Sequence, residues 1–412
     1  MPEDKPNVLI VGAGLGGLLL GALLERASIP YTIFERTSIV KPLGVMEEFI
    51  ALGKNTVDCV INKENVGPVL TVSNSLQKKF TGYHNYNIAR PILYDLLLRQ
   101  VPAHKLLFNK RVLTVTEEED SVKIHTADSS VYTGDILVGA DGAYSAVRQQ
   151  IYEALDKEGK LPKSDQEELP FSSTCLVGQT TKVDLDLFPE FKGEAVPFYN
   201  TMAADKPFTW VVGVTAQETL TWMVIHHLDH VSSKEAEQQR FGELENSEWG
   251  PHAAQAMCDE TRHFPLPIGV KKMNLGDIYD LTPKDQISKV MLEEKVFKTW
   301  YSGRTVLLGD ACHKLNPSGA HGAVTSMHDA IALANLIYAL PSSPGTAEIE
   351  QAFTEYQAER IPHVLESFKS SQMLATRILG AVHNESDAGM DVEDCAAQDG
   401  AESTDLWVDE GD

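Results

Sequence analysis

The sequence has few cysteines, no long apolar run and a shortage of basic residues. Its 412 residues include five cysteines, which stand far apart and form no Cys-x-x-Cys pair, so neither a disulfide framework nor a zinc site is indicated. No apolar run reaches the roughly 18 residues of a membrane-spanning helix, and the polar start of the chain is not typical of a signal peptide. We therefore expect a cytoplasmic protein with no integral membrane segment and no bound metal.

Acidic residues outnumber basic ones. The chain has 35 Lys and Arg against 59 Asp and Glu, which gives a formal net charge of -24. Because such a surface repels phosphate backbones, we expect no nucleic-acid partner. Eleven of the acids lie between Asn384 and Asp412, where there is no Lys or Arg. Such a segment buries too little apolar surface to offset its chain entropy, so we predict an acidic disordered tail over 381–412.

The residues that are present predict a globular α/β protein. Hydrophobic residues make up 43% of the chain and charged residues 23%, as in ordinary soluble domains. The apolar runs Val8–Val11 and Tyr31–Phe34, separated by the helical stretch Leu18–Leu24, predict a βαβ unit with a buried parallel sheet. Ile136–Val138 and Thr305–Leu308 predict further strands of the same kind.

Between those regions the pattern changes to alternating, aromatic-rich strands, which predicts an inserted antiparallel sheet. The predicted strands cover 174–183, 195–200, 208–215 and 220–228. We expect helices at 91–101, 232–245, 251–262, 326–340 and 347–379, the last of them kinked or broken at Pro362. The expected domains are therefore a split α/β domain (1–168 and 286–380) and an inserted domain (169–285).

The first turn of the chain carries a Gly-x-Gly-x-x-Gly motif between the first strand and the first helix. Gly12 permits the tight turn, Gly14 lets the backbone approach a pyrophosphate, and Gly17 lets the helix pack on the sheet. Glu35 ends the second strand, where a carboxylate can accept the ribose hydroxyls. A glycine-rich turn without a ligand is the alternative, but the strand, the helix and the acid together favour a dinucleotide site.

A second segment distinguishes between the dinucleotides. The stretch from Ser302 to Ala323, which contains Gly-Asp-Ala-Cys-His and a later glycine-rich turn, resembles the flavin-binding signature of the class A flavoprotein monooxygenases, the family of para-hydroxybenzoate and salicylate hydroxylases. The resemblance implies that Asp310 holds the ribityl chain of FAD. It also implies that the segment 317–323 lies against the isoalloxazine ring, with the candidate contacts Pro317, Gly319, Gly322 and Ala323. A turn that opens a helix suits the negative charge of reduced flavin, although a phosphate would suit it equally.

Two further stretches are similar to motifs of the same family. The segment 134–148 resembles its Asp-Gly motif, in which the residues matching Asp141 and Gly142 touch FAD and help NAD(P)H to dock. The helix start at Arg90 resembles its Arg-x-x-Leu motif, whose Arg reaches the FAD pyrophosphate. A buried turn for Asp141 and a surface salt bridge for Arg90 are the structural alternatives. Arg36, beside Glu35, completes the candidate cofactor-binding residues.

The resemblance implies a Rossmann-like FAD-binding domain, split in sequence, with an inserted substrate domain, and the function of an FAD-dependent monooxygenase. NADH or NADPH would reduce the flavin, O₂ would add at C4a, and the hydroperoxide would hydroxylate or epoxidise a small organic substrate of aromatic, polyketide or terpenoid type. The protein supplies position and electrostatics, so no catalytic residue is named. An FAD-dependent reductase or dehydrogenase and a flavin-poor pseudoenzyme of the same fold are the alternatives. The oligomeric state is open.

The chain departs from this family at two places. Val324 stands where the family commonly has Asn after its Gly-Gln-Gly turn, which removes a polar contact. The segment between Arg36 and Arg90 is short, and Ile39 to Leu52 replaces a longer loop and helix. A flavin pocket that is open to water on that side loses activated oxygen as peroxide. We therefore expect weaker FAD binding than is usual for the family, with uncoupled peroxide formation.

Three other features have an ordinary structural interpretation. The run from His226 to His230 is not interpreted as a metal site, because strand alternation sends adjacent histidines to opposite faces. Cys312 and His313 are not interpreted as a nucleophile pair, since adjacent residues seldom face each other. The inserted sheet covers the flavin face in the family, yet its large side chains are more often core, and these are Tyr199, Trp210, Met223 and His226.

Overall fold

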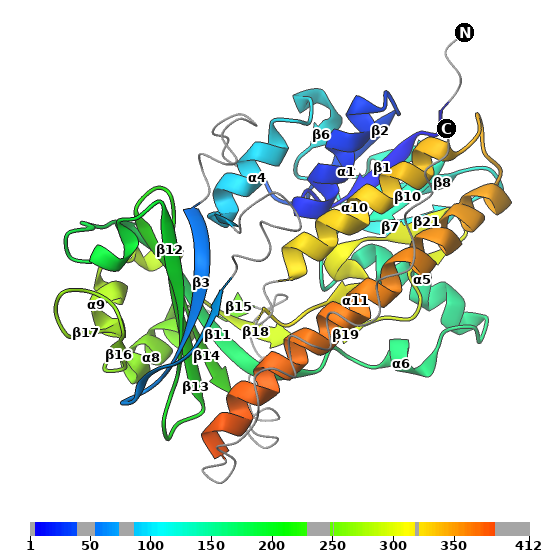
Figure 1. Ribbon diagram of the computed structural model, residues 1–412. Helices are drawn as coiled ribbons and strands as arrows, with labels where there is room; N and C mark the ends of the chain where they lie inside the picture. Colours follow the sequence, from blue (N-terminus) through cyan, green and yellow to red (C-terminus); the bar gives the residue numbers. More distant parts are fainter. Residues whose placement is uncertain are drawn as a thin grey trace, which may run out of the picture.

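The computed structural model describes residues 5–38, 54–73, 86–228, 248–249, 251–317 and 321–383. Its two largest sheets have six and nine strands, and they occupy opposite halves of the molecule (Figure 1). Several expectations fall outside the described residues. These are the short segment Ile39 to Leu52, the helix at 232–245, Gly319 and the acidic tail from Asn384 onward.

The six-stranded sheet is parallel except for one edge pair. Its order is β20-β21-β10-β1-β2-β6, and only β20 and β21 run antiparallel. Every residue of β1, β10 and β21 is buried, as expected for a sheet covered on both faces. The bounds are β1 (Val8–Val11), β2 (Tyr31–Phe34), β6 (Leu106–Leu107), β10 (Ile136–Gly139), β20 (Tyr301–Ser302) and β21 (Thr305–Leu307).

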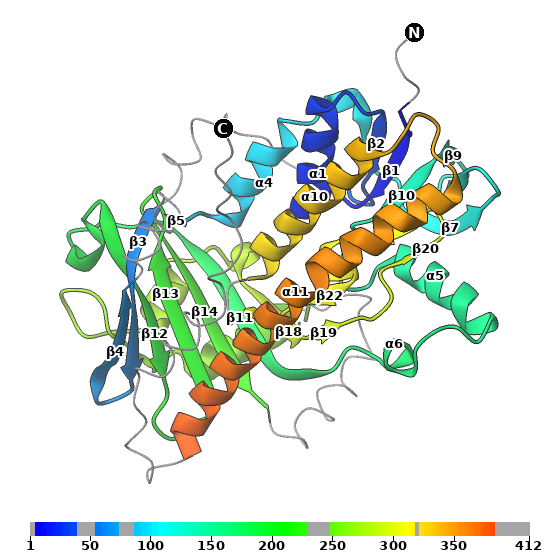
Figure 2. The ribbon, with the colours of Figure 1, turned by 45° about the vertical axis from the view of Figure 1, so that its right-hand side comes forward.

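Helices cover this sheet. α1 packs against both α4 and α10, and α10 packs against α11, which gives the parallel row of helices seen in Figure 2. A Cβ at Gly16 would lie 2.3 Å from the Oγ of Ser326, so α1 and α10 approach closely there. The helices are α1 (Leu15–Arg26), α4 (Arg90–Leu98), α5 (Ala146–Lys157), α6 (Lys163–Gln166), α10 (Gly322–Ala339) and α11 (Thr346–His383).

Two helix expectations need correction. α10 begins at Gly322 instead of Ser326, so it starts within the glycine-rich turn itself. α11 is continuous through Pro362, so the expected break is wrong, whereas a kink there stays a prediction. Pro362 and Ala358, whose carbonyl loses its helical partner, are both exposed, so water can satisfy that carbonyl and the helix continues.

Smaller elements complete this half. β7 and β8 form an antiparallel hairpin, and β9 joins it as a third strand. β19 pairs with β22 next to the loop after β21. The bounds are β7 (Val112–Glu117), β8 (Val122–Thr126), β9 (Val131–Gly134), β19 (Lys295–Val296), β22 (His313–Lys314) and the single turns η1 (Ala103–Lys105) and η4 (Gly309–Ala311).

The nine-stranded sheet is wider than the sequence suggests. Its order is β15-β18-β11-β14-β13-β12-β3-β4, with β5 beside β3, so β3, β4, β5 and β18 come from outside 169–285. The pair β3–β12 is parallel, which corrects the expectation of a wholly antiparallel sheet. No hairpin joins these two strands, so nothing forces them to run in opposite directions. The bounds are β3 (Lys54–Lys63), β4 (Gly67–Ser73), β5 (Tyr86–Asn87), β11 (Phe171–Lys182), β12 (Ala195–Met202), β13 (Phe208–Val214), β14 (Thr219–His227), β15 (Glu248–Trp249) and β18 (Ser288–Glu293).

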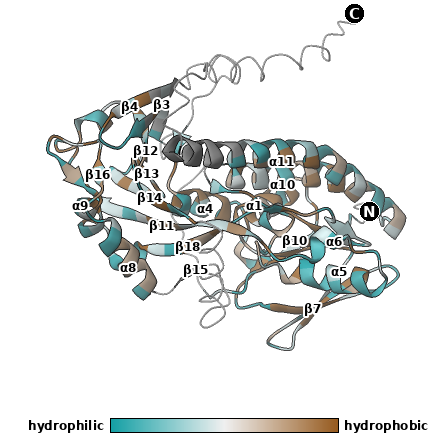
Figure 3. Ribbon diagram, turned by 90° about the horizontal axis from the view of Figure 1, so that it is seen from below, coloured by the Kyte–Doolittle hydropathy of each residue, from teal (hydrophilic) through white to brown (hydrophobic). Residues whose placement is uncertain are grey.

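The two faces of the nine-stranded sheet have different neighbours. On β11, Leu176 belongs to the large apolar cluster under α8 and α9, whereas Cys175 and Val177 belong to a small separate cluster. This is the alternation that a two-faced strand requires. In Figure 3, α8 and α9 lie beside the nine-stranded sheet, and both contact β11. The remaining elements of this half are η2 (Pro189–Phe191), α8 (Pro251–Thr261), β16 (Pro265–Leu266), β17 (Met273–Asn274), α9 (Leu275–Asp280) and η3 (Lys284–Gln286).

Among the described residues, no helix is both long enough and apolar enough to cross a membrane.

Candidate functional site

Three hollows meet at Gly14. We call them the Glu35 hollow, of about 590 Å³, the Tyr94 hollow, of about 420 Å³, and the Asp310 cavity, of about 610 Å³. Gly14 lines all three, and Glu35 lines the first two. Together they form an extended path from the end of β2, past the start of α1, to the segment after β21. A path of this shape suits a dinucleotide better than a compact ligand.

The glycines of the first turn differ in their surroundings. A Cβ at Gly17 would lie 2.1 Å from the carbonyl oxygen of Gly12, and one at Gly12, where φ is +106°, would lie 2.3 Å from that of Ala140. No heavy atom of the described residues lies within 4 Å of a Cβ at Gly14. Gly12 and Gly17 therefore close the turn, whereas Gly14 borders open space at the positive end of α1, which favours an anion.

The carboxylate of Glu35 is held from two sides. The amide of Ala13 donates to Oε2 at 3.0 Å, and Thr37 donates to Oε1 from its amide at 2.9 Å and its hydroxyl at 3.0 Å. These bonds fix the direction of the carboxylate. An ionised carboxylate can accept about four hydrogen bonds, so Glu35 keeps capacity for donors such as the ribose hydroxyls.

Asp141 lies after β10, at the start of α5. Its Oδ2 accepts from the amides of Ala146 at 2.7 Å and Val147 at 3.3 Å, while Oδ1 is buried with no hydrogen-bond partner among the described residues. Burial raises the pKa of Asp141 above its usual value, although these donors oppose the shift. A buried acceptor without a partner beside Gly142 and the Glu35 hollow is a position that a ligand hydroxyl could fill.

The Asp310 cavity opens after β21. Asp310 lies in η4, and its Oδ2 accepts from Nζ of Lys314 at 2.6 Å; the two side chains are 35% and 26% exposed. The cavity is also lined by Pro317, Gly322 and Ala323, at the start of α10. A Cβ at Gly322 would meet no described heavy atom within 4 Å. The turn therefore leaves room for a flat group against the helix start.

A buried network holds this segment in place. Asp329 of α10 accepts from Nε2 of His313 at 2.5 Å, from Nε of Arg360 at 2.8 Å and from the amide of Gly309 at 3.3 Å. Burial alone would raise the pKa of Asp329, but the charges and hydrogen bonds of His313 and Arg360 outweigh it and keep that pKa below its usual value. The segment 309–313 is thus tied at both ends to one carboxylate.

The nine-stranded sheet borders the Asp310 cavity with a wall that is apolar except for Glu293 of β18. Cys175 and Val177 of β11, Met223 of β14, and Val290 and Leu292 of β18 line it, and all five belong to the small cluster on this face of the sheet. Burial raises the pKa of the Cys175 thiol to about 12, so it is protonated at neutral pH. The wall is suited to an apolar substrate rather than to nucleophilic chemistry.

The described candidate residues all lie along this path. The Glu35 hollow contains Gly12, Gly14, Glu35, Arg36, Asp141 and Gly142. The Asp310 cavity contains Gly14, Gly17, Arg90, Gly142, Asp310, Pro317, Gly322 and Ala323. Residues that are more than 300 positions apart in the sequence are therefore brought to one place. Arg90 is exposed, and the side chain of Val324 is 45% exposed.

Sequence reasoning missed several lining residues. Lys110 and Arg111 line the Glu35 hollow, Tyr94 lines the hollow named after it, and Lys314 lines the Asp310 cavity. Single basic or aromatic residues carry no pattern by themselves. Only the proximity of 314 to the Gly-Asp segment could have drawn attention to Lys314.

The large side chains of the inserted sheet divide between its faces. Trp210 is fully buried in the cluster under α8 and α9, and Tyr199 packs on the same cluster. His226 stacks on Phe208. Of the four expected candidates, only Met223 lines the Asp310 cavity.

The two other features also have separate partners. His227 lies between Ser173 and Thr209, away from the ring stack of His226. The thiol of Cys312 donates to the carbonyl of Gly309, whereas His313 contacts Asp329. No group of His, Cys, Asp and Glu able to hold a metal occurs within the described ranges.

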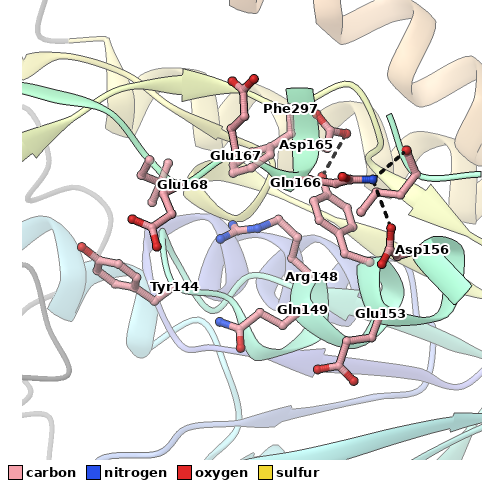
Figure 4. Close-up of a pocket in the computed structure, with 13 residues that line it drawn as sticks. Tyr144, Arg148, Gln149, Glu153, Asp156, Asp165, Gln166, Glu167, Glu168 and Phe297 are labelled. Carbon is pink, nitrogen blue, oxygen red and sulfur yellow. Dashed lines mark hydrogen bonds between the residues drawn. The ribbon is translucent and has the colours of Figure 1, made fainter. Parts of the chain in front are cut away.

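A further pocket of about 730 Å³ lies beside α5. Figure 4 shows Tyr144 at one end of it and Asp156, Asp165 and Gln166 at the other, with Arg148 between them. Arg148 donates to the carbonyls of Ala143 at 2.6 Å and Ala311 at 2.8 Å. It therefore joins the loop after β10 to the loop after β21. The pocket adjoins the Glu35 hollow, with which it shares Tyr144 and Gln149.

Comparison with known proteins finds relatives that are described as FAD-binding or FAD-dependent. A family model described as FAD binding domain matches residues 275–370. The FAD-dependent monooxygenase ptmM of Penicillium ochrochloron is 27% identical over 399 residues, which cover 91% of this chain and 89% of that protein. The FAD-dependent monooxygenase atmM of Aspergillus flavus is 26% identical, with 90% and 78% covered.

Solved structures share the fold at low identity. HpxO of Klebsiella pneumoniae, complexed with FAD and uric acid, has a TM-score of 0.67 and 18% identity, and the match covers 90% of this chain and 88% of that one. The 2,6-dihydroxypyridine-3-hydroxylase from Arthrobacter nicotinovorans has a TM-score of 0.69 and 14% identity, with 91% and 93% covered. The expected mixed α/β fold and the resemblance to class A flavin hydroxylases are both confirmed.

Proposed function

From this resemblance to FAD-dependent monooxygenases, we propose that the protein binds FAD along the path from Glu35 to Ala323 and uses NADH or NADPH and O₂ to oxygenate a small organic substrate. The observation that carries the proposal is the meeting of three hollows at Gly14. The path would take the ADP half of the cofactor beside Glu35 and Gly14 and the flavin half beside Asp310. FAD is the common cofactor that needs both halves.

The residues along the path suit the parts of FAD. Glu35 would accept the adenosine ribose hydroxyls, and the start of α1 at Gly14 would face the pyrophosphate. Arg90, which lines the same cavity, adds a charged fork of donors for that group. Asp310 would accept from the ribityl chain. The start of α10 at Gly322 would place its positive end near the flavin ring.

FAD, when bound, would supply the redox chemistry: it accepts two electrons from NAD(P)H and passes them to O₂. The overall balance is substrate-H, NAD(P)H, H⁺ and O₂ giving substrate-OH, NAD(P)⁺ and water. Epoxidation of a double bond consumes the same reagents. The chain would contribute binding, orientation and the exclusion of water, which the apolar side chains of Cys175, Val177 and Met223 favour.

The first experiment is spectroscopic. The full chain, purified and supplied with FAD, is expected to retain a flavin spectrum after gel filtration and to consume O₂ when NADH or NADPH is added. A flavin spectrum without O₂ consumption would favour a reductase or dehydrogenase instead. A colourless protein would point to a flavin-poor relative and contradict the proposal.

The second experiment tests the flavin half of the path. Asp310→Ala removes a charged acceptor, whose hydrogen bond is worth about 1.5–3 kcal/mol, so FAD affinity should fall by at least tenfold. Asp186→Ala is the matched control, because it breaks another Lys–Asp pair, with Lys192, outside the three hollows. Equal FAD affinity in the two variants would refute the assignment of Asp310.

A further inference from the structure

Lys314 faces the Asp310 cavity because of its place on a short strand. β22 contains only His313 and Lys314 and pairs with β19. Adjacent strand residues point to opposite faces: His313 is fully buried against Asp329, whereas Lys314 is 26% exposed and lines the cavity. Because the contact of His313 with Asp329 holds the buried side of this strand, the backbone position of Lys314 is held as well.

The ion pair of Lys314 and Asp310 spans a segment that is rigidly held. Gly309 and His313, beside its two ends, both donate to Asp329, which Arg360 holds in turn. The ammonium of Lys314 donates a hydrogen bond to Oδ2 of Asp310 at 2.6 Å. A carboxylate pinned through one oxygen on a fixed backbone presents its other oxygen in one direction.

We propose that Lys314 is a positioning residue for the cofactor: it holds the Asp310 carboxylate so that Oδ1 accepts a hydroxyl of the FAD ribityl chain, and it neutralises that carboxylate beside a cofactor with an anionic pyrophosphate. This inference rests on the proposed function. It concerns Lys314, to which the resemblance assigns no role.

Because the Lys314–Asp310 pair is partly exposed, we expect its contribution to be larger when the cofactor is bound than when it is absent. In the free protein both side chains are partly exposed, and ion pairs of this kind contribute about 0–1 kcal/mol. A bound cofactor would cover the cavity and exclude water, which strengthens the interaction between the two charges. Loss of Lys314 should therefore weaken FAD binding much more than it lowers the stability of the free protein.

The test is a double-mutant cycle on the full chain freed of flavin and titrated with FAD, with calorimetry as the readout. Lys314→Met should lower FAD affinity about tenfold, while the melting temperature of the free protein falls by less than about 3 °C. Lys314→Arg, which keeps the charge, should restore most of the affinity. In the Asp310→Ala background, Lys314→Met should cause no further loss. Lys192→Met, which breaks the Lys–Asp pair outside the hollows, is the matched control.

The possible results separate the inference from the proposed function. If the unmodified protein binds no FAD, the proposed function fails and the inference fails with it. If it binds FAD and Lys314→Met binds equally well, only the inference is overturned. An equal tenfold loss in both backgrounds would also overturn it, because Lys314 would then act on the cofactor directly and not through Asp310.

Discussion

The two large sheets contribute to the candidate site in different ways. The six-stranded sheet is covered on both faces, and the proposed cofactor path runs past the carboxyl ends of its strands β1, β2, β10 and β21, the usual place for ligands in such sheets. The nine-stranded sheet acts through one face. Its other face only builds core under α8 and α9. In the six-stranded sheet, the residues that line the path are those at the carboxyl ends of the strands. In the nine-stranded sheet, they are those on one face of the strands.

The comparison is sharpest along β14. Trp222 and Val224 point to the large cluster, whereas Met223 and Ile225 belong to the small cluster that faces the other half of the molecule. One residue of register separates a core position from a cavity position. Substitutions on the two faces should therefore separate stability from ligand binding.

The largest effect is expected on the core face. Trp210 is fully buried in the cluster under α8 and α9, and its indole donates to the carbonyl of Pro265 at 3.0 Å. Trp210→Ala should lower the free energy of unfolding by about 3–5 kcal/mol. Urea unfolding followed by circular dichroism measures this change. FAD affinity of the fraction that remains folded should be unchanged, and a large loss of affinity there would contradict the division of the two faces.

In the six-stranded half, substitutions within the first glycine-rich turn should also separate stability from ligand binding. Gly17→Ala places a methyl group 2.1 Å from the carbonyl of Gly12, so it should destabilise the protein by about 1–3 kcal/mol. Gly14→Ala is the matched control, since its Cβ meets open space: thermal unfolding should be nearly unchanged while FAD affinity falls. Equal melting temperatures for the two variants would contradict the assigned roles.

Much of the first sheet is predictable from the sequence, because buried parallel strands leave continuous apolar runs such as Val8–Val11. The Gly-x-Gly-x-x-Gly turn and the Gly-Asp segment are also local patterns, so Gly14 and Asp310 can be found without a structure. Their meeting in one path was expected only because the motifs occur together in a known family.

The second sheet is less predictable, for physical reasons. Alternation identifies its strands but does not say which face a ligand uses, so Trp210 and Met223 look equivalent in the sequence. The parallel pairing of β3 with β12 joins segments more than 100 residues apart, and no local signal fixes it. Lys314 and Lys110 stand alone, and a single lysine is a surface residue in most contexts.

His227 tests whether water reaches the inner face of the nine-stranded sheet, by which we mean the face that carries the small cluster. Burial, with repulsion from His226, lowers the pKa of His227 to about 4, against about 6.5 in an unfolded chain. The unfolded state therefore binds more protons between these values, and stability is lost as the pH falls from about 6.5 towards 4. At pH 5 the loss from this group is about 2 kcal/mol.

His227→Gln removes this titration. The stability of the unmodified protein, relative to the variant, should therefore fall by about 2 kcal/mol between pH 7.5 and pH 5. Urea unfolding of both proteins at the two pH values gives the difference directly. A constant difference would mean that water reaches His227 and that the inner face is open at this end.

The smallest effect on stability is expected at Met223, on the cavity side of β14. Its side chain is only partly buried and lines the Asp310 cavity, so Met223→Ala should cost less than Met→Ala in a core, below about 2 kcal/mol. The lost side chain enlarges the cavity instead. With FAD bound, Met223→Ala should therefore change which organic compounds stimulate NAD(P)H oxidation, in favour of bulkier ones, while FAD affinity stays the same. Ile225→Ala, in the same cluster but not lining the cavity, serves as the control, and a shift of substrate preference equal to that of Met223→Ala would show that the effect comes from the sheet as a whole rather than from the cavity wall.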